Sequence, residues 1–361
     1  TIPGMTAPPA IHMVHVAGSH REVGAQIGSA CAPVLREAVE FDADIPQGRT
    51  RADQLSLADR YREVTAEAHP WYLDELEGAA EAAGVDPRAL FACATEEIWY
   101  EPRTHALKGR CSDLVAVPPA TAGDRVLVAH NNDMHRKYQE QLVAIEWEVP
   151  GDPVVLTIGN GIWISVGWNS AGLSLTGNEL SPNDERIGVP REIQVRSMLR
   201  GPTIDMMVGE ALRHDRASSY NNVLVSREGE VVNVEGSAMS AEMTEPDERG
   251  QLVHTNHYVC EGMLGYEGDP EYAVHSALRY RRASELLHAE GPGTVTADRL
   301  RTMLSDHENA PDALCRHPER WGGDTATAFW CVADVTEMRI TFGCGNPCDS
   351  VAQEYAFTMR A

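Results

Sequence analysis

The residue best placed for covalent chemistry is Cys111, in the segment Gly109-Arg110-Cys111-Ser112-Asp113. This segment joins a polar stretch without a clear helical period to the first run of β-type residues. A cysteine thiolate is a nucleophile that forms covalent acyl intermediates. Cysteine is also among the residue types most often buried, so the segment alone favours a core role for Cys111 over a catalytic one.

A second group of residues has side chains that could bind a metal ion. Its members are His130, Asp133, His135, His254 and His257. Imidazole and carboxylate groups are ligands that zinc accepts. The spacing is unfavourable, because His130 and His135 would point to opposite faces of a strand and no pair fits a helical His-Glu-x-x-His motif. We keep a metal-dependent hydrolase that uses the other four residues, His130, Asp133, His254 and His257, as an alternative interpretation.

Other cofactor motifs are not apparent in the sequence. Cys344 and Cys348 have the wrong gap for a standard zinc knuckle and no second cysteine pair accompanies them, so we expect a packing role or a chance pair. No Gly-x-Gly-x-x-Gly follows a strand and no phosphate-binding loop is present. We therefore expect neither a metal nor an organic cofactor.

The elements that must position Cys111 change in type along the chain. A capping box at Ser19–Glu22 predicts a helix from about residue 20, and helical patterns continue at 57–83, ending at Gly84, and at 87–98. From Cys111 onward the pattern changes to short β-type runs, which we expect to form a meander of adjacent strands. These runs are 114–117, 126–129, 154–158, 162–166 and 173–176.

The second half of the chain alternates between helical and strand patterns. The expected elements are helices at 192–200 and 203–213, strands at 222–225 and 231–234, a helix at 272–289, and strands at 326–333 and 338–342. Residues 305–324 have no regular pattern, and a segment of this length forms either a substrate lid or a surface loop. The alternation predicts one α+β domain in which helices cover sheets.

Charge and hydropathy exclude two classes of partner. Thirty Lys and Arg against fifty-four Asp and Glu give a formal charge of −24, which argues against nucleic acid and against anionic membranes. No stretch of 18 uninterrupted apolar residues is present, so we expect no membrane span. The first residues lack the pattern of a signal peptide, and eight scattered cysteines do not form a disulfide framework, so we expect a cytoplasmic protein.

Five motifs follow one another along the chain in a characteristic order. They are Cys111–Asp113 (CSD), Val126–Asp133 (VLVAHNND), Gly167–Asn178 (GWNSAGLSLTGN), Leu252–His257 (LVHTNH) and Ser276–Tyr280 (SALRY). In this order they resemble the cysteine N-terminal-nucleophile (Ntn) hydrolase superfamily. Upstream, Ser19–Gly28 and Glu75–Val85 are similar to the helical prosegment of the branch that contains acyl-coenzyme A:isopenicillin N acyltransferase.

The resemblance implies a fold and a division of the chain. The implied fold is α+β, a four-layer αββα sandwich of two stacked antiparallel sheets flanked by helices. It is a single domain over residues 1–361, made as a precursor and cut before Cys111. The helical segment 1–110 and the catalytic segment 111–361 would then remain associated with each other.

The resemblance also implies a self-processing mechanism. The Cys111 thiol would attack the Arg110 carbonyl, and hydrolysis of the intermediate would free the Cys111 α-amine. An α-amine has an ordinary pKa of about 7.7 to 8.0, so it can act as a general base near neutral pH. The enzyme would then form an acyl-cysteine from a small-molecule amide or thioester, such as a peptide-like or β-lactam-like metabolite, and pass the acyl group to water or to an amine.

The family's motifs assign roles to further residues. Asp133 would orient the α-amine, while Asn178 and Asn256 would donate hydrogen bonds to the oxyanion. Arg279 would hold the Cys111 end or a substrate carboxylate with its forked donors. His130, in place of a frequent arginine of the family, and His257 are candidates for substrate binding.

One further alternative depends on the residue before the nucleophile. Many relatives have glycine there, whereas this chain has Arg110. An uncut precursor that keeps the fold and serves as a binding protein therefore stays open.

Overall fold

The structure of the protein is a computed structural model that describes residues 10–99 and 110–358. The longer α-helices are α1 (His20–Ala30), α3 (Arg51–Ala68), α4 (Pro70–Ala83), α6 (Arg191–Met198), α7 (Ile204–Ala211), α8 (Pro270–His288) and α9 (Ala297–Leu304). The shorter ones are α2 (Ala32–Ala38), α5 (Pro87–Cys93) and α10 (Pro318–Trp321). Among the residues described, no helix is both long and apolar enough to cross a lipid bilayer.

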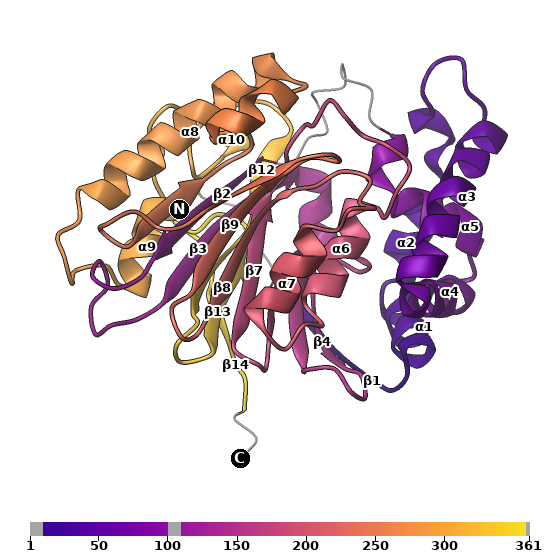
Figure 1. Cartoon of the computed structure of the whole chain (residues 1–361), viewed down its shortest axis with the longest axis horizontal. Helices are drawn as coiled ribbons and strands as arrows, with labels where there is room; N and C mark the ends of the chain where they lie inside the picture. The colour runs from indigo at the N-terminus through magenta and orange to yellow at the C-terminus, as the bar shows by residue number, and fades with distance from the viewer. Residues whose placement is uncertain (1–9, 100–109, 359–361) are drawn as a thin grey trace.

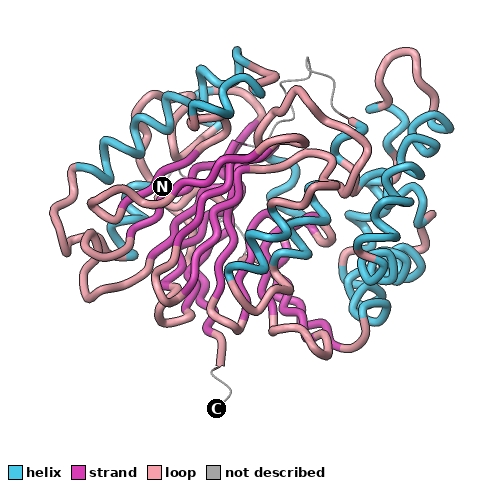
Figure 2. Tube along the Cα trace, in the orientation of Figure 1, coloured by secondary structure: helices cyan, strands magenta, loops and turns pink. Residues whose placement is uncertain are grey.

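The strands form two sheets, which run through the middle of the molecule in Figures 1 and 2. Sheet A has the order β1-β4-β5-β6-β7-β8-β9-β10, and sheet B has the order β11-β2-β3-β12-β13-β14. Sheet A contains β1 (His12–Ala17), β4 (Val143–Glu148), β5 (Val155–Asn160), β6 (Trp163–Asn169), β7 (Leu173–Asn178), β8 (Asn221–Ser226), β9 (Val231–Gly236) and β10 (Ala241–Thr244). Sheet B contains β2 (Arg110–Ala116), β3 (Leu127–His135), β11 (Gln251–His254), β12 (Thr325–Asp334), β13 (Arg339–Cys344) and β14 (Gln353–Ala356).

Three apolar clusters define the order of the layers. One cluster joins the facing sides of the two sheets, for example Val115 and Val128 of sheet B with Leu156 and Val166 of sheet A. A second joins the outer face of sheet B to α8 and α9, and a third joins the outer face of sheet A to α1–α7. The layers are therefore helix, sheet, sheet, helix, as predicted.

Most predicted elements are confirmed, with local differences. The Ser19 capping box begins α1, and Gly84 ends α4 with a left-handed φ of 72°. The helix expected over 57–83 is two helices, because Pro70 lacks an amide hydrogen and disfavours helical geometry at His69, which has ψ 61°. One pair is parallel rather than antiparallel, since β1 runs parallel to β4.

The expectation of one continuous meander is wrong. The first two β-type runs are β2 and β3 of sheet B, whereas the next three are β5, β6 and β7 of sheet A. The chain crosses between the sheets after β3 through a 3₁₀ segment, Arg136–Gln141, which leads into β4. Of the two alternatives for 305–324, a substrate lid or a surface loop, the surface loop does not describe the central part, because Leu314 and Cys315 are fully buried.

Candidate active site

Cys111 lies near the start of β2 and faces the interior between the two sheets. Successive side chains on a strand point to opposite faces of the sheet, so Cys111 and Val115, four residues apart, point to the same face. Val115 belongs to the apolar cluster between the two sheets. Cys111 pairs with Asn132 of β3, and its Sγ lies 3.7 Å from Asn132 Nδ2. Asp113 and His130 form the next pair on this face. The thiol is thus surrounded by buried polar groups and is itself 6% exposed.

The backbone of Cys111 is held at both its nitrogen and its carbonyl oxygen. Its N–H donates to Asn256 Oδ1 at 2.6 Å, and its carbonyl oxygen accepts from Arg279 Nη1 at 2.6 Å. Arg279 also donates to Ser112 Oγ at 3.0 Å and to Asn256 Oδ1 at 2.9 Å. Because Asn256 and Arg279 are almost fully buried, these contacts fix the backbone beside the expected cleavage bond.

The other side of that bond is held through the Arg110 side chain. Arg110 Nη1 donates to Asp312 Oδ1 at 2.7 Å, and the guanidinium carbon lies 5.5 Å from the centre of the Tyr272 ring. Asp312 also contacts Arg316 Nη1 at 3.2 Å and His275 Nδ1 at 2.7 Å. Burial alone would raise the pKa of Asp312, but these cationic and hydrogen-bonding partners hold it below its usual value.

Asp133 lies on the face of sheet B that α8 and α9 cover, opposite Arg110 in the β2–β3 register. Its Oδ1 accepts from Thr327 Oγ1 at 2.7 Å, and its Oδ2 has no hydrogen-bond partner in the described structure. Burial raises the pKa of Asp133, while the charges of Arg316 and Arg279 oppose this shift. One carboxylate oxygen thus remains available beside the strand that begins with Arg110.

Asn178 ends β7 and connects sheet A to this region. Its Oδ1 accepts from Asn221 Nδ2 at 3.2 Å and lies 2.9 Å from His254 Nδ1. Its Nδ2 is buried and has no hydrogen-bond partner among the residues described. The following residue, Glu179, accepts through its carbonyl oxygen from Asn256 Nδ2 at 3.1 Å. Asn178 and Asn256 therefore lie at adjoining strand ends, and Asn178 keeps both side-chain N–H groups free within the described residues, whereas Asn256 uses one of its two.

The two candidate substrate-binding histidines lie in different environments. His130 Nδ1 lies 2.9 Å from Asp113 Oδ1, with both side chains inaccessible to solvent. Burial lowers the pKa of His130, but Asp113 and the Cys111 thiol outweigh this effect and raise it to about 10. His257 contacts Ser276 Oγ at 2.9 Å, and its burial together with the nearby cations lowers its pKa to about 4.

The metal cluster expected as an alternative does not form. Within residues 10–99 and 110–358, no three of His130, Asp133, His254 and His257 bring ligand atoms within 4.8 Å of one another. His254 instead contacts Glu235 Oε1 at 2.7 Å through Nε2, as well as Asn178. Each of these histidines has its own protein partner, which leaves this hydrolase alternative without a site.

The site is thus a buried polar network around one cysteine. The family model described as "Acyl-coenzyme A:6-aminopenicillanic acid acyl-transferase" matches residues 120–349. The chain belongs to this acyltransferase family. The matched residues include Asp133, Asn178, Asn256 and Arg279, and they begin nine positions after Cys111.

Three individual proteins are similar to this acyltransferase-family chain to different extents in sequence identity and coverage. The chain is 26% identical over 344 residues to the acyl-coenzyme A:6-aminopenicillanic-acid-acyltransferase 40 kDa form of Emericella nidulans, covering 93% of each chain. A mutant of conjugated bile acid hydrolase from Clostridium perfringens is 10% identical with a TM-score of 0.45, covering 69% of this chain and 97% of that chain. Penicillin V acylase from Agrobacterium tumefaciens is 13% identical with a TM-score of 0.37, covering 65% and 83%.

Several residues of this site were not identified from the sequence. They are Asn132, Tyr272, Asp312 and Arg316. Asp312 and Arg316 lie in the irregular stretch 305–324, where neither helical nor strand periodicity indicates a buried position. Asp312 and Arg316 are two of seven charged residues in this stretch, so their charge does not single them out. A cavity of about 320 Å³ lined by Val117, Gly229 and Gly250 lies towards the opposite end of β2 from Cys111.

Proposed function

We propose that this chain is a self-processing acyltransferase or amidohydrolase that cleaves its Arg110–Cys111 bond and uses Cys111 as its nucleophile. The observation that carries the proposal is the pair of buried contacts at Cys111, from its N–H to Asn256 and from Arg279 to its carbonyl oxygen. Membership of an acyltransferase family supports acyl chemistry at this site.

In the cleavage step, the Cys111 Sγ attacks the Arg110 carbonyl carbon. The C–S bond forms as the C–N bond breaks, and the thiol proton moves to the nitrogen, which becomes the α-amine. Water then hydrolyses the thioester, releasing the Arg110 carboxylate and regenerating the thiol. The contacts of Arg110 with Asp312 and Tyr272 hold the acyl side of the bond during this step.

In turnover, the free α-amine of Cys111 accepts the thiol proton as the sulfur attacks a substrate carbonyl. Asn256 Oδ1, which accepts from the amide N–H in the uncut chain, can accept equally from the amine and orient it. Asp133 supplies a negative charge on the opposite face of β2 for the protonated amine.

The oxyanion needs donors that no other group uses, and Asn178 Nδ2 meets this requirement. Asn256 Nδ2 donates one of its two hydrogens to the Glu179 carbonyl oxygen, which leaves it one donor and constrains its orientation. We therefore propose Asn178 as the principal side-chain donor to the oxyanion, with Asn256 holding the amine. One such donor contributes about 2.7 to 4 kcal/mol of transition-state stabilisation.

The two segments would stay together after cleavage as one domain, 1–110 with 111–361. Strand β1 of the first segment pairs with β4 of the second along sheet A. Helices α1–α5 share an apolar cluster with the outer face of that sheet, and Glu75 forms a buried ion pair with Arg196 at 2.8 Å. Separation would expose the apolar cluster and leave Arg196 uncompensated.

We propose a small-molecule amide or thioester as substrate, of the peptide-like or β-lactam-like natural-product kind. The named substrate of the related acyltransferase, 6-aminopenicillanic acid, supports this class. Transfer and hydrolysis differ in whether an amine or water reaches the acyl-cysteine. We further propose a reducing, cytoplasmic location, where the eight free cysteines would remain thiols.

A thiol-reactive acyl probe tests this proposal on the folded protein. We expect peptide mapping to find the label on Cys111, and Cys344→Ala as a matched control to be labelled at the same rate. The label should be absent from Cys111→Ala. An unlabelled Cys111 would contradict the proposal and favour a binding protein.

A further inference from the structure

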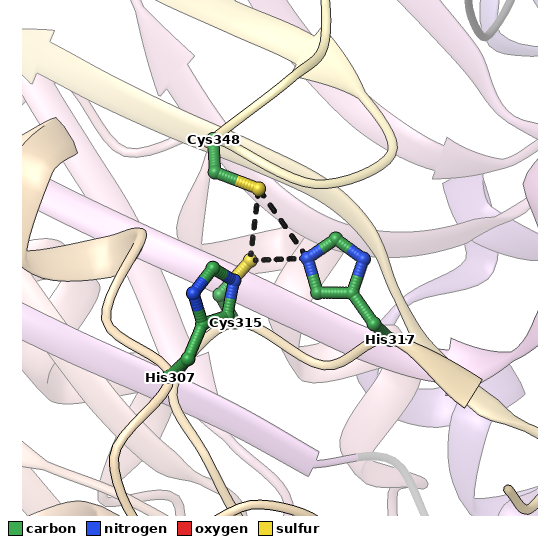
Figure 3. Close-up of side chains that lie close together, drawn as sticks. All are labelled: His307, Cys315, His317 and Cys348. Carbon is green, nitrogen blue, oxygen red and sulfur yellow. Dashed lines mark hydrogen bonds between the residues drawn. The ribbon is translucent and has the colours of Figure 1, made fainter. Parts of the chain in front are cut away.

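Four metal-binding side chains gather outside the candidate active site. They are His307, Cys315, His317 and Cys348, shown together in Figure 3, and their ligand atoms all lie within 4.8 Å of one another. The first three come from the irregular stretch 305–324, and Cys348 comes from the loop after β13. Cys348 does not gather with Cys344, whose nearest hydrogen-bond acceptor is the Gln139 carbonyl oxygen.

The distances match those of a tetrahedral zinc site. The two sulfur atoms are 3.7 Å apart, and His317 Nε2 lies 3.3 Å from each of them. Tetrahedral bonds of about 2.3 Å to sulfur and about 2.0 Å to nitrogen place two sulfurs roughly 3.8 Å apart and a sulfur and a nitrogen roughly 3.5 Å apart. All three separations are slightly shorter than these values, so a small expansion of the cluster would give bonded geometry.

Neighbouring residues orient these ligands. Glu319 Oε1 lies 2.7 Å from His317 Nδ1, so the carboxylate holds the proton on that nitrogen and leaves the Nε2 lone pair facing the sulfurs. Asn346 Nδ2 donates to Cys315 Sγ at 3.3 Å, a hydrogen bond that stabilises a thiolate. The Trp321 ring lies 5.6 Å from the rings of both His307 and His317 and limits their rotation.

His307 completes the group from the other side of the sulfurs. Its ring lies 5.0 Å from the His317 ring, centre to centre. Its Nε2 is inaccessible to solvent and has no hydrogen-bond partner within the described part of the chain. A buried imidazole nitrogen without a partner is costly, and a bound cation would remove that cost.

We propose that His307, Cys315, His317 and Cys348 bind one Zn²⁺ ion in a structural site. A tetrahedral set of two sulfurs and two nitrogens favours zinc over the harder divalent cations. Four protein ligands leave no position for water, so the site would stabilise structure rather than catalyse hydrolysis. Binding releases the two thiol protons and changes no oxidation state. Cys348 is the exposed member and gives the ion a route of entry.

The location of the site indicates what the ion would hold in place. Arg316 lies between two ligands, its N–H donates to Thr327 Oγ1 at 2.9 Å, and Thr327 in turn donates to Asp133. Asp312, three residues before Cys315, contacts Arg110. The zinc would therefore fix the segment that holds Arg110, and this consequence, unlike the metal binding itself, rests on the proposed cleavage at Arg110–Cys111.

Elemental analysis of reduced, gel-filtered protein tests the site directly. We expect about one zinc per chain, and at least a tenfold lower content in both Cys315→Ser and Cys348→Ser. Cys344→Ser, at the end of β13 and outside the cluster, is the matched control and should keep the full content. Replacing zinc with Co²⁺ in the wild-type protein should give the visible absorption of a tetrahedral cobalt–thiolate site, a readout that needs no variant to fold.

Three results would overturn the zinc site. One is reduced wild-type protein that takes up neither Zn²⁺ nor Co²⁺. Another is an intact mass lower by two hydrogens with a mapped Cys315–Cys348 disulfide that persists under reductant. The third is zinc retained in both cysteine variants, which would place the ion elsewhere. A chain that carries one zinc but is never cleaved contradicts only the proposed function.

Discussion

The surroundings of Cys111 and of Cys315 both combine buried thiols with imidazoles, but the donors are arranged differently. Near Cys111, the imidazole of His130 is paired with Asp113, and the remaining contacts hold the Cys111 backbone and the Arg110 side chain, on the two sides of one peptide bond. Near Cys315, the sulfurs and the His317 Nε2 converge on one point. The difference shows that contacts along a bond suit bond cleavage, whereas lone pairs directed at a point suit a cation.

Among the changes that test this difference between the two regions, removing the Cys111 thiol should have the largest effect, and it should act on turnover. We expect Cys111→Ala to lose amide or thioester turnover by at least about a thousandfold, because the proposed mechanism takes both the nucleophile and, after cleavage, the base from this residue. Zinc content should not change. Steady-state kinetics with elemental analysis on the same sample measure both, and turnover retained in this variant would show that another residue is the nucleophile.

Removing the free donor of Asn178 should have the next largest effect. Asn178→Ala should lower kcat by about a hundred- to a thousandfold with little change in KM, because the donor acts mainly on the transition state. Cys344→Ala, which lies outside both clusters, is the comparison variant and should leave kcat within a few-fold. A change in KM alone for Asn178→Ala would make it a ground-state binding residue.

Removing the forked contact of Arg279 should have a smaller effect, on the rate of self-cleavage. Arg279→Lys keeps the charge but cannot reach both the Cys111 carbonyl oxygen and Asn256 Oδ1. We expect self-cleavage slowed about ten- to a hundredfold, corresponding to about 1.5 to 3 kcal/mol for a hydrogen bond to a charged group. A time course of fragment formation measures the rate, and cleavage at the wild-type rate would assign Arg279 a purely structural role.

The two histidines near Cys111 should affect stability with opposite dependence on pH. The folded-state pKa of His130 is raised to about 10, so its stabilisation is complete below the unfolded value of about 6.5 and is lost as the pH rises towards 10. The pKa of His257 is lowered to about 4, so stability falls as the pH drops from about 6.5 to 4.

Urea unfolding across this pH range measures these contributions. The difference between wild type and His130→Gln should shrink above neutral pH, by at most about 1.4 kcal/mol per pH unit. The difference between wild type and His257→Gln should change only below neutral pH. If the difference in free energy of unfolding between wild type and each variant stayed constant over this pH range, it would contradict the titration of His130 and His257 proposed above.

The sequence predicted the layered fold because its periodic segments are strong. Residues 127–129 and 328–333 lie on adjacent central strands, β3 and β12, and both are continuous apolar runs. Strand β4 was not predicted, although the alternation of Ile145 and Trp147 with Glu146 and Glu148 is the pattern of a half-buried strand. The crossing from β3 to β4 depends on tertiary packing between the sheets, and no local pattern indicates it.

The site was predictable where residues lie in ordered motifs and not where long-range packing unites them. Cys111, Asn256 and Arg279 belong to recognisable motifs, and the structure joins them through hydrogen bonds. Cys315 and Cys348 are 33 residues apart, with a spacing that matches no zinc motif, and only the folding of two irregular segments brings them together.

The intact mass of freshly purified, denatured protein tests the central claim most directly. The account predicts two fragments, 1–110 and 111–361, that meet between Arg110 and Cys111, and a single uncut chain for Cys111→Ala. A single 39.5 kDa chain in the wild-type protein would contradict it, because the α-amine of Cys111 would never be released.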